Sequence, residues 1–158
     1  MKRLFWSGIV CLFIAAAMTV SGGQDRSAND RFRGQFVGAW RLASFEQEGA
    51  DGKTHRSDST GLLVFTHDGH MSVQVMERNP QAQGTAGPEQ YSQGGYEASF
   101  GTYQIDESSH TFTFHVDGAL VRSLVGKDLP RAFELSGKQL TVRSARPEEH
   151  WRVIWERY

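Results

Sequence analysis

The sequence has 158 residues, of which 22% are charged, and a formal net charge of −1 at pH 7. A chain of this length supplies enough residues for one folded domain. Its near-neutral charge and the absence of a long Lys/Arg cluster argue against a nucleic-acid-binding protein, which needs a basic surface to contact phosphates.

The N-terminus has the order of a secretory signal peptide. Two basic residues, Lys2 and Arg3, precede the uncharged run 4–20, and small residues follow that run. This order predicts a signal peptide over residues 1–23, cleaved at about residue 22, and therefore an exported protein, periplasmic or secreted. The alternative is an uncleaved membrane anchor, although the run is shorter than the roughly 20 residues that span a bilayer.

The single cysteine, Cys11, lies inside this segment, so the mature chain would contain none. An exported domain without disulfides is typical of a bacterial periplasm more than of a disulfide-stapled secreted scaffold. The mature chain could form no zinc–thiolate site, and we expect no metal and no cofactor. We also expect no membrane span once the signal peptide is removed.

Residues 24–35 are polar and predict a flexible leader, whereas residues 36–158 predict one all-β domain. The first strand pattern alternates imperfectly, since Trp40, Leu42 and Phe45 are not evenly spaced. Short alternating apolar patterns predict strands at 36–46, 61–67, 70–77, 98–105, 110–117, 129–135, 138–143 and 150–158, with a shorter apolar run at 119–125.

Tight turns join most of these strands. The pairs Asp68-Gly69 and Ser136-Gly137 predict hairpin turns, because glycine accepts a positive φ. Residues 55–60 predict a polar connection. Residues 78–95 predict a long loop with one helical turn at Pro88, and such a loop is either a functional lid or a surface loop.

The pattern predicts a single antiparallel up-and-down β-barrel of about eight strands. Gly38 and Trp40 open the first strand, and Arg157 closes the last. We expect Trp40 to plug one end of the barrel, with Arg157 stacked on its indole in a structural contact; Arg152 is the alternative partner.

Several stretches resemble the bacterial lipocalin-like domain family, a calycin-type β-barrel group. They occur in order as FVGAWRLASFE, GLLVFTHDGHMSVQVM, YEASFGTYQID, FHVDG followed by LVG, RAFELSGKQLTV and IWER. The resemblance implies an antiparallel barrel with a central cavity and a role in binding a small molecule rather than a defined reaction. The chain departs from the family pattern at Ser99, Phe114 and Leu124, which would alter the size and polarity of the cavity.

Seven residues are candidates for lining that cavity. Tyr103, Arg131 and His115 match recurrent positions of the family, so the resemblance implies a role for them. The candidates are Tyr103, His115, Arg131, Phe112, Phe114, Phe133 and Val73.

The orientation of His115 depends on which face of its strand points inward. If the odd-numbered face does, His115 is a polar group in an apolar cavity, able to orient a ligand or to act as a base. If the even-numbered face does, Phe112, Phe114 and Val116 line the cavity and His115 is solvated.

Arg131 is the candidate for holding an anionic head group, because a guanidinium pairs with a carboxylate through two hydrogen bonds. The alternative is an ion pair at the rim, with Glu134 or Asp117. His67 and His70 flank a hairpin turn, and no third metal ligand is identifiable, so we expect exposed histidines there.

Three functions remain open at this stage. The first is a carrier of one small hydrophobic or amphipathic molecule, consistent with an exported, aromatic-rich barrel that has no recognisable catalytic motif. The second is an isomerase or cyclase in which His115 and Tyr103 perform acid–base chemistry. The third is a filled barrel that binds a partner through the loop 78–95.

Overall fold

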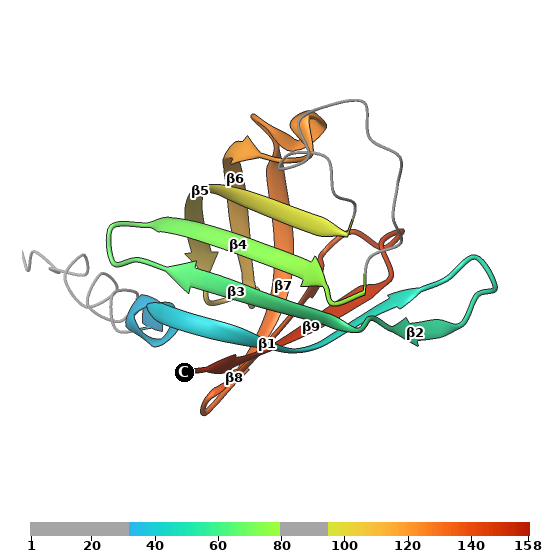
Figure 1. Ribbon diagram of the computed structural model, residues 1–158. Coiled ribbons are helices and arrows are strands. Elements are labelled where there is room, and N and C mark those ends of the chain that lie inside the picture. The colour runs from blue at the N-terminus through green and yellow to red at the C-terminus, as the bar shows by residue number, and fades with distance from the viewer. Residues whose placement is uncertain (1–31, 80–94) are drawn as a thin grey trace, which may run out of the picture.

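A computed structural model describes residues 32–79 and 95–158 of the chain (Figure 1). Residues 32–36 are helical, and almost all the rest is β-structure. The elements are β1 (Gly38–Glu48), β2 (Thr54–Arg56), β3 (Ser59–Phe65), β4 (His70–Glu77), β5 (Tyr96–Asp106), β6 (Thr111–Ala119), the 3-10 helix η2 (Arg122–Leu124), β7 (Asp128–Ser136), β8 (Gln139–Ser144) and β9 (Trp151–Arg157).

Eight of the strands close into an antiparallel barrel. The strand order is β1-β3-β4-β5-β6-β7-β8-β9, and β1 also pairs with β9, so the sheet has no free edge along the ring. The sequence prediction of one antiparallel up-and-down barrel is therefore confirmed. Closure removes the unpaired strand edges that would otherwise promote aggregation.

The ninth strand, β2, was not predicted. It pairs only with the end of β1, through Glu46, Gln47 and Glu48, and forms a hairpin that extends beyond the barrel (Figure 1). All three residues of β2 are exposed, so neither face is buried and no apolar alternation marks it in the sequence. The prediction of a polar connection over residues 55–60 was thus wrong at both ends, because residues 55–56 belong to β2 and residues 59–60 to β3.

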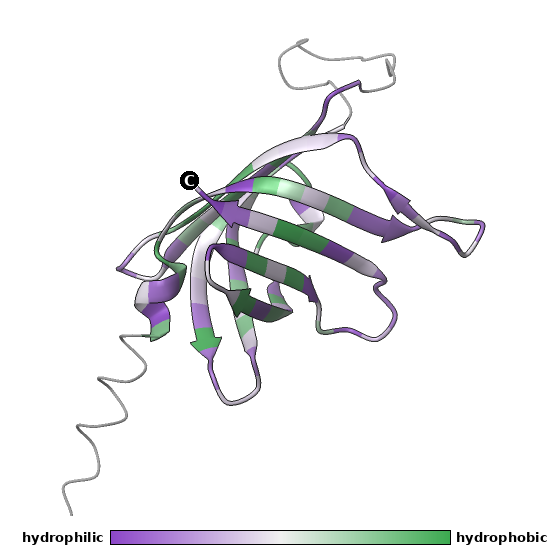
Figure 2. Ribbon diagram, turned by 90° about the horizontal axis from the view of Figure 1, so that it is seen from below, coloured by the Kyte–Doolittle hydropathy of each residue, from purple (hydrophilic) through white to green (hydrophobic). Residues whose placement is uncertain are grey.

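Alternation along each strand places apolar side chains inside the barrel, and Figure 2 shows hydrophobic and hydrophilic residues following one another along the strands. In β6, Phe112, Phe114 and Val116 are at most 4% exposed, while Thr113 and His115 face outward. The even-numbered face of β6 is therefore the inner one.

A bulge in β1 explains the uneven spacing of its apolar residues. Pairing with β9 shifts register between Leu42 and Ser44, which leaves Ala43 as an extra residue. A bulge reverses the alternation downstream, so Phe45 points to the same side as Trp40. The two halves of β1 thereby both contribute side chains to the interior.

The helical turn 32–36 closes one end of the barrel. Phe36 and Trp40 are both fully buried, and the Trp40 indole N–H donates to the Phe36 carbonyl at 2.8 Å. The Arg157 guanidinium carbon lies 4.3 Å from the centroid of the Trp40 ring, whereas Arg152 pairs with Glu46. Arg157 also donates to the carbonyls of Gln35 and Val37, which tie the helical turn to β9.

The structure corrects the predicted leader at its C-terminal end. Phe32 packs against the core, with its ring 5.9 Å from that of Phe133. Residues 32–35 therefore belong to the folded domain. The other part of that prediction, residues 24–31, lies outside the described residues, as do the predicted signal peptide and the predicted helical turn at Pro88.

The turns at this closed end follow the glycine pattern of the sequence. Gly69 and Gly137 have φ values of 88° and 58°, which confirms both predicted hairpin turns. Gly38 has φ 132°, and a Cβ there would lie 2.9 Å from the Arg157 guanidinium. Gly38 therefore allows Arg157 to approach β1 and cover Trp40.

Candidate functional site: a cavity open at one end of the barrel

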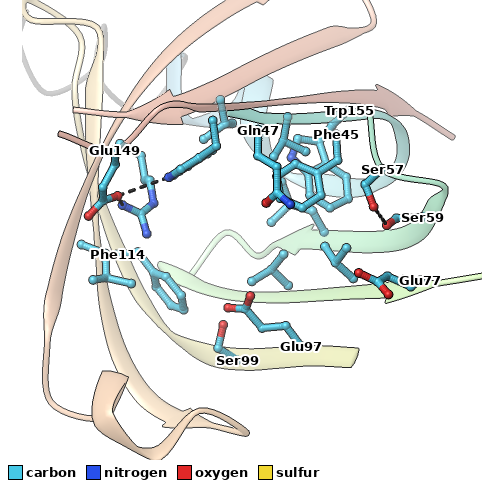
Figure 3. Close-up of a pocket in the computed structure, with 18 of the residues that line it drawn as sticks. Phe45, Gln47, Ser57, Ser59, Glu77, Glu97, Ser99, Phe114, Glu149 and Trp155 are labelled. Atoms are coloured by element: carbon cyan, nitrogen blue, oxygen red, sulfur yellow. Dashed lines mark hydrogen bonds and ion pairs between the residues drawn. The ribbon is translucent and has the colours of Figure 1, made fainter. Parts of the chain in front are cut away.

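Opposite the closed end, the barrel encloses a cavity of about 640 Å³ (Figure 3). This volume lies within the range of roughly 300–1,000 Å³ that is common for small-molecule sites. The deep part of the wall is apolar, and its residues include Leu63, Met71, Phe112, Leu129, Val142 and Trp155. Within the described residues, this part of the interior is therefore not filled by the barrel's own side chains.

Strand β4 illustrates how polarity changes with depth. Its inward residues Met71, Val73, Val75 and Glu77 all line the cavity. Met71 lies deepest, 6% exposed, and Glu77 is exposed at the mouth. The alternation of one strand therefore produces a wall that is apolar within and acidic at its opening.

Among the described residues that line the cavity, Arg131 is the only lysine or arginine. Its guanidinium carbon lies 4.9 Å from the centroid of the Trp151 ring, and its Nη1 donates to the Pro130 carbonyl at 3.1 Å. Its Nη1 also lies 3.9 Å from a Glu149 carboxylate oxygen. Burial lowers the pKa of the Arg131 guanidinium, and the charge of Glu149 opposes that shift.

The sequence alternatives for Arg131 named the wrong partners. Glu134 pairs with Arg143 at 2.6 Å, and Asp117 lies near His115 on the outer surface. The partner is Glu149, which the loop between β8 and β9 brings to Arg131 from 18 positions along the chain. Candidate partners taken from neighbouring strands could not include Glu149, because Glu149 lies on a loop.

Glu149 is held by several groups. Hydrogen bonding from the Ser144 side chain lowers the pKa of the Glu149 carboxyl most, and Trp151, Arg146 and Arg131 lower it further. The Trp151 indole N–H donates to it at 3.2 Å, and Arg146 pairs with it at 3.1 Å. This network fixes Trp151 at the cavity mouth, where the indole packs against the Arg131 guanidinium.

The mouth is polar and mostly acidic. Glu48, Glu77 and Glu97 line it and are exposed, and the hydroxyls of Ser57 and Ser59 are 2.6 Å apart. The sequence analysis did not identify these residues or the aromatic wall formed by Phe45, Trp151 and Trp155. Inward alternation along β4 could have identified Glu77. Phe45 could be identified only by counting from Trp40 through the β1 bulge, and Trp151 by counting back from Trp155 along β9.

Four of the predicted cavity residues do line the cavity: Val73, Phe112, Phe114 and Arg131. Three do not. His115 is on the outer surface with 47% of its side chain exposed, and it pairs with Asp128 at 2.7 Å. The resemblance to the family implied an inward His115. The pairing of β6 with β5 and β7 instead buries Phe114, so the adjacent His115 points outward.

Tyr103 and Phe133 lie below the cavity, in the closed end. The Tyr103 hydroxyl donates to the Thr66 carbonyl at 2.9 Å, and burial raises the pKa of this phenol. Phe133 packs edge-on against Phe36, with ring centroids 4.9 Å apart. Both side chains therefore stabilise the plug, and the acid–base pair expected of Tyr103 and His115 is not formed, because the barrel wall separates them.

Both hairpin histidines, His67 and His70, are exposed, as predicted. His70 lies 3.1 Å from Asp68, and hydrogen bonds from Thr66 and His70 lower the pKa of Asp68 to about 2. Within residues 32–79 and 95–158, no group of three or more His, Cys, Asp or Glu side chains could hold a metal ion. In the same part of the chain, no helix is long and apolar enough to span a bilayer.

A closed antiparallel barrel with an apolar cavity open at one end is the architecture used by barrels that hold one small ligand. Residues 37–158 match the model of a family described as a lipocalin-like domain. The chain belongs to this lipocalin-like domain family, which confirms the resemblance read from its motifs.

Two solved structures are similar to the chain at low identity. One is a lipocalin-like protein from Bacteroides uniformis, with 17% identity and a TM-score of 0.46, covering 78% of this chain and 99% of that one. The other is an uncharacterized protein from Bacteroides eggerthii, with 14% identity, a TM-score of 0.46 and the same 78% and 99% coverage. No curated protein gives a significant match.

Proposed function

We propose that this protein binds one small hydrophobic or amphipathic molecule in the barrel cavity. The observation that carries the proposal is an apolar cavity of about 640 Å³ that opens to solvent through a polar mouth. Apolar side chains such as Leu63, Phe114 and Trp155 face this space and would gain contacts from an apolar ligand.

The closed end supports the same function. The Phe36–Trp40 plug is packed and hydrogen-bonded, so it stabilises the barrel without help from the open half. The side chains that line the cavity are consequently not required to hold the barrel together, and they can be selected to fit a ligand. Unfilled core volume is destabilising in a protein that has no use for it, and larger side chains at positions such as Val73 would fill it.

We further propose that residues 1–23 direct export and that the binding protein acts in a periplasm or outside the cell. The order of basic, apolar and small residues supports this part of the proposal. The mass of the protein isolated from its own cells is expected to lack about the first 22 residues. A mass that includes them would contradict cleavage.

Filling the cavity tests the binding function. Val73→Phe adds a ring at a position that lines the cavity, so it should weaken binding of a neutral apolar probe by at least about tenfold. Binding of decanol and of 2-naphthol can be followed by tryptophan fluorescence, because Trp151 and Trp155 line the same space.

Gln74→Phe is the matched control, since Gln74 is the next residue of β4 and faces outward. We expect it to bind both probes as the unmodified protein does. The proposal fails if neither probe binds saturably to the unmodified protein, or if Val73→Phe binds them as well as Gln74→Phe does.

A further inference from the structure

Two glutamates face the cavity mouth from neighbouring strands. In the β4–β5 register, Val75 lies opposite Glu97, which makes Glu77 the diagonal neighbour of Glu97 on the same face. Diagonal neighbours in an antiparallel pair are about 7–8 Å apart, close enough for two flexible carboxylates to reach one ligand group. Figure 3 shows both side chains at the cavity wall formed by β4 and β5.

Neither carboxylate is neutralised within the described part of the chain. Glu77 and Glu97 form no ion pair there, and Arg131 is closer to Glu149. The charge of Glu97 reaches Arg131 only weakly, as the smallest of the influences on the Arg131 pKa. By sequence, residues 80–94, which connect the two strands, contain no Lys or Arg. As far as the described residues define it, the mouth therefore presents unpaired negative charge.

A serine that lines the cavity lies next to this charge. Ser99 is 4% exposed, lines the cavity, and follows Glu97 by two residues, so both point to the same face of β5. The described residues form no hydrogen bond with its hydroxyl. Because Ser99 lines the cavity, a ligand in the cavity can donate a hydrogen bond to this hydroxyl.

We infer that the ligand carries a protonated primary or secondary amine, which binds at Glu77 and Glu97 and donates an N–H to the Ser99 hydroxyl. Its apolar part occupies the cavity below. This inference rests on the proposed binding function and adds the chemical class of the ligand. A carboxylate ligand would instead have to pass Glu48, Glu77 and Glu97 to reach Arg131, whose Nη1 already lies 3.9 Å from a Glu149 carboxylate oxygen.

A series of decyl compounds tests the inference by isothermal titration calorimetry below their micelle concentrations, at neutral pH and low salt. We expect decylamine to bind at least about tenfold more tightly than decanoate and more tightly than decanol, with an advantage that decreases as salt is added. Glu77→Gln and Glu97→Gln should each weaken decylamine binding by about fivefold and leave decanol binding unchanged.

Glu107→Gln is the matched charge control, because Glu107 is exposed on the turn at the closed end. It should leave decylamine binding unchanged. Ser99→Ala should weaken binding of decylamine but not of decyltrimethylammonium, which has no N–H to donate. The mouth glutamates and Ser99 are not part of the plug, and thermal melting of each variant checks that it is folded.

The outcomes separate the two claims. If decanol binds but decylamine binds no more tightly, or if decanoate binds most tightly, the amine inference is wrong and the binding function stands. If no decyl compound binds saturably, the binding function itself is wrong.

Discussion

Replacing Trp40 with alanine is expected to destabilise the protein by about 3–5 kcal/mol, the range measured for large aromatic-to-alanine changes in a core. Trp40 is fully buried, and its loss would leave a cavity beneath Arg157 and between β1 and β9. It would also leave the Phe36 carbonyl without the indole N–H that now reaches it at 2.8 Å. Urea unfolding followed by circular dichroism measures the change in the free energy of unfolding.

Trp40→Phe separates packing from hydrogen bonding. Phenylalanine keeps an aromatic ring under Arg157 but cannot donate to Phe36, so a loss of about 1–3 kcal/mol is expected. A Trp40→Ala protein within about 1 kcal/mol of the unmodified one would contradict the role of Trp40 as the structural plug.

Replacing Gly101 with alanine should be at least as damaging, with a loss of about 3 kcal/mol or more or a failure to fold. The register of β5 and β6 shifts between Phe100 and Gly101. A Cβ at Gly101 would collide with the His115 carbonyl oxygen and lie 2.8 Å from the Asp117 backbone nitrogen. These are backbone atoms of a paired strand, so they cannot move aside as a flexible side chain can.

Gly34→Ala is the matched control, because a Cβ there has no atom within 4 Å. The same chemical change is therefore expected to leave stability unchanged, or slightly increased by the lower entropy of the unfolded chain. Equal melting temperatures for the Gly101→Ala and Gly34→Ala proteins would show that β6 does not approach Gly101 this closely.

The parts of the fold that could be predicted are those where local sequence and tertiary structure agree. Strands β4 and β6 alternate cleanly and bury one face, and Gly69 and Gly137 supply positive φ at the tight turns. The pairing of Trp40 with Arg157 followed from placing the first and last strands side by side, which a closed barrel requires.

The missed elements lack such a local signal. Strand β2 buries neither face, and the bulge at Ala43 breaks the alternation of β1. The sequence predicts a polar leader over residues 24–35 and a first strand from Phe36, although Phe32 and Phe36 are one helical turn apart and both contact the core. Their apolar spacing was detectable in a segment otherwise judged by its polar composition.

The candidate site was predictable in its apolar part only. Val73, Phe112 and Phe114 follow from inward alternation, whereas the polar groups depend on contacts between distant segments. Arg131 meets Glu149 across a loop. The resemblance to the family indicated an inward His115. Its neighbours Phe114 and Val116 are both buried, however, so His115 points outward.

The position of a side chain along the barrel axis, near the mouth or near the closed end, could not be predicted from the sequence either. Tyr103 and Phe133 point inward as expected, yet they lie at the closed end, where the helical turn packs onto them and leaves no space for a ligand. Alternation gives the side of a strand on which a residue lies. It does not give the distance of that residue from the mouth.

The central claim is that the cavity holds a small molecule, and native mass spectrometry of the protein isolated from its own cells tests it most directly. Comparing the native mass with the denatured mass shows whether a molecule is bound. We expect a reproducible additional mass that is lost on denaturation and is absent from Val73→Phe protein prepared in the same way. A native mass equal to that of the bare chain, in the unmodified protein and the variant alike, would contradict a carried ligand.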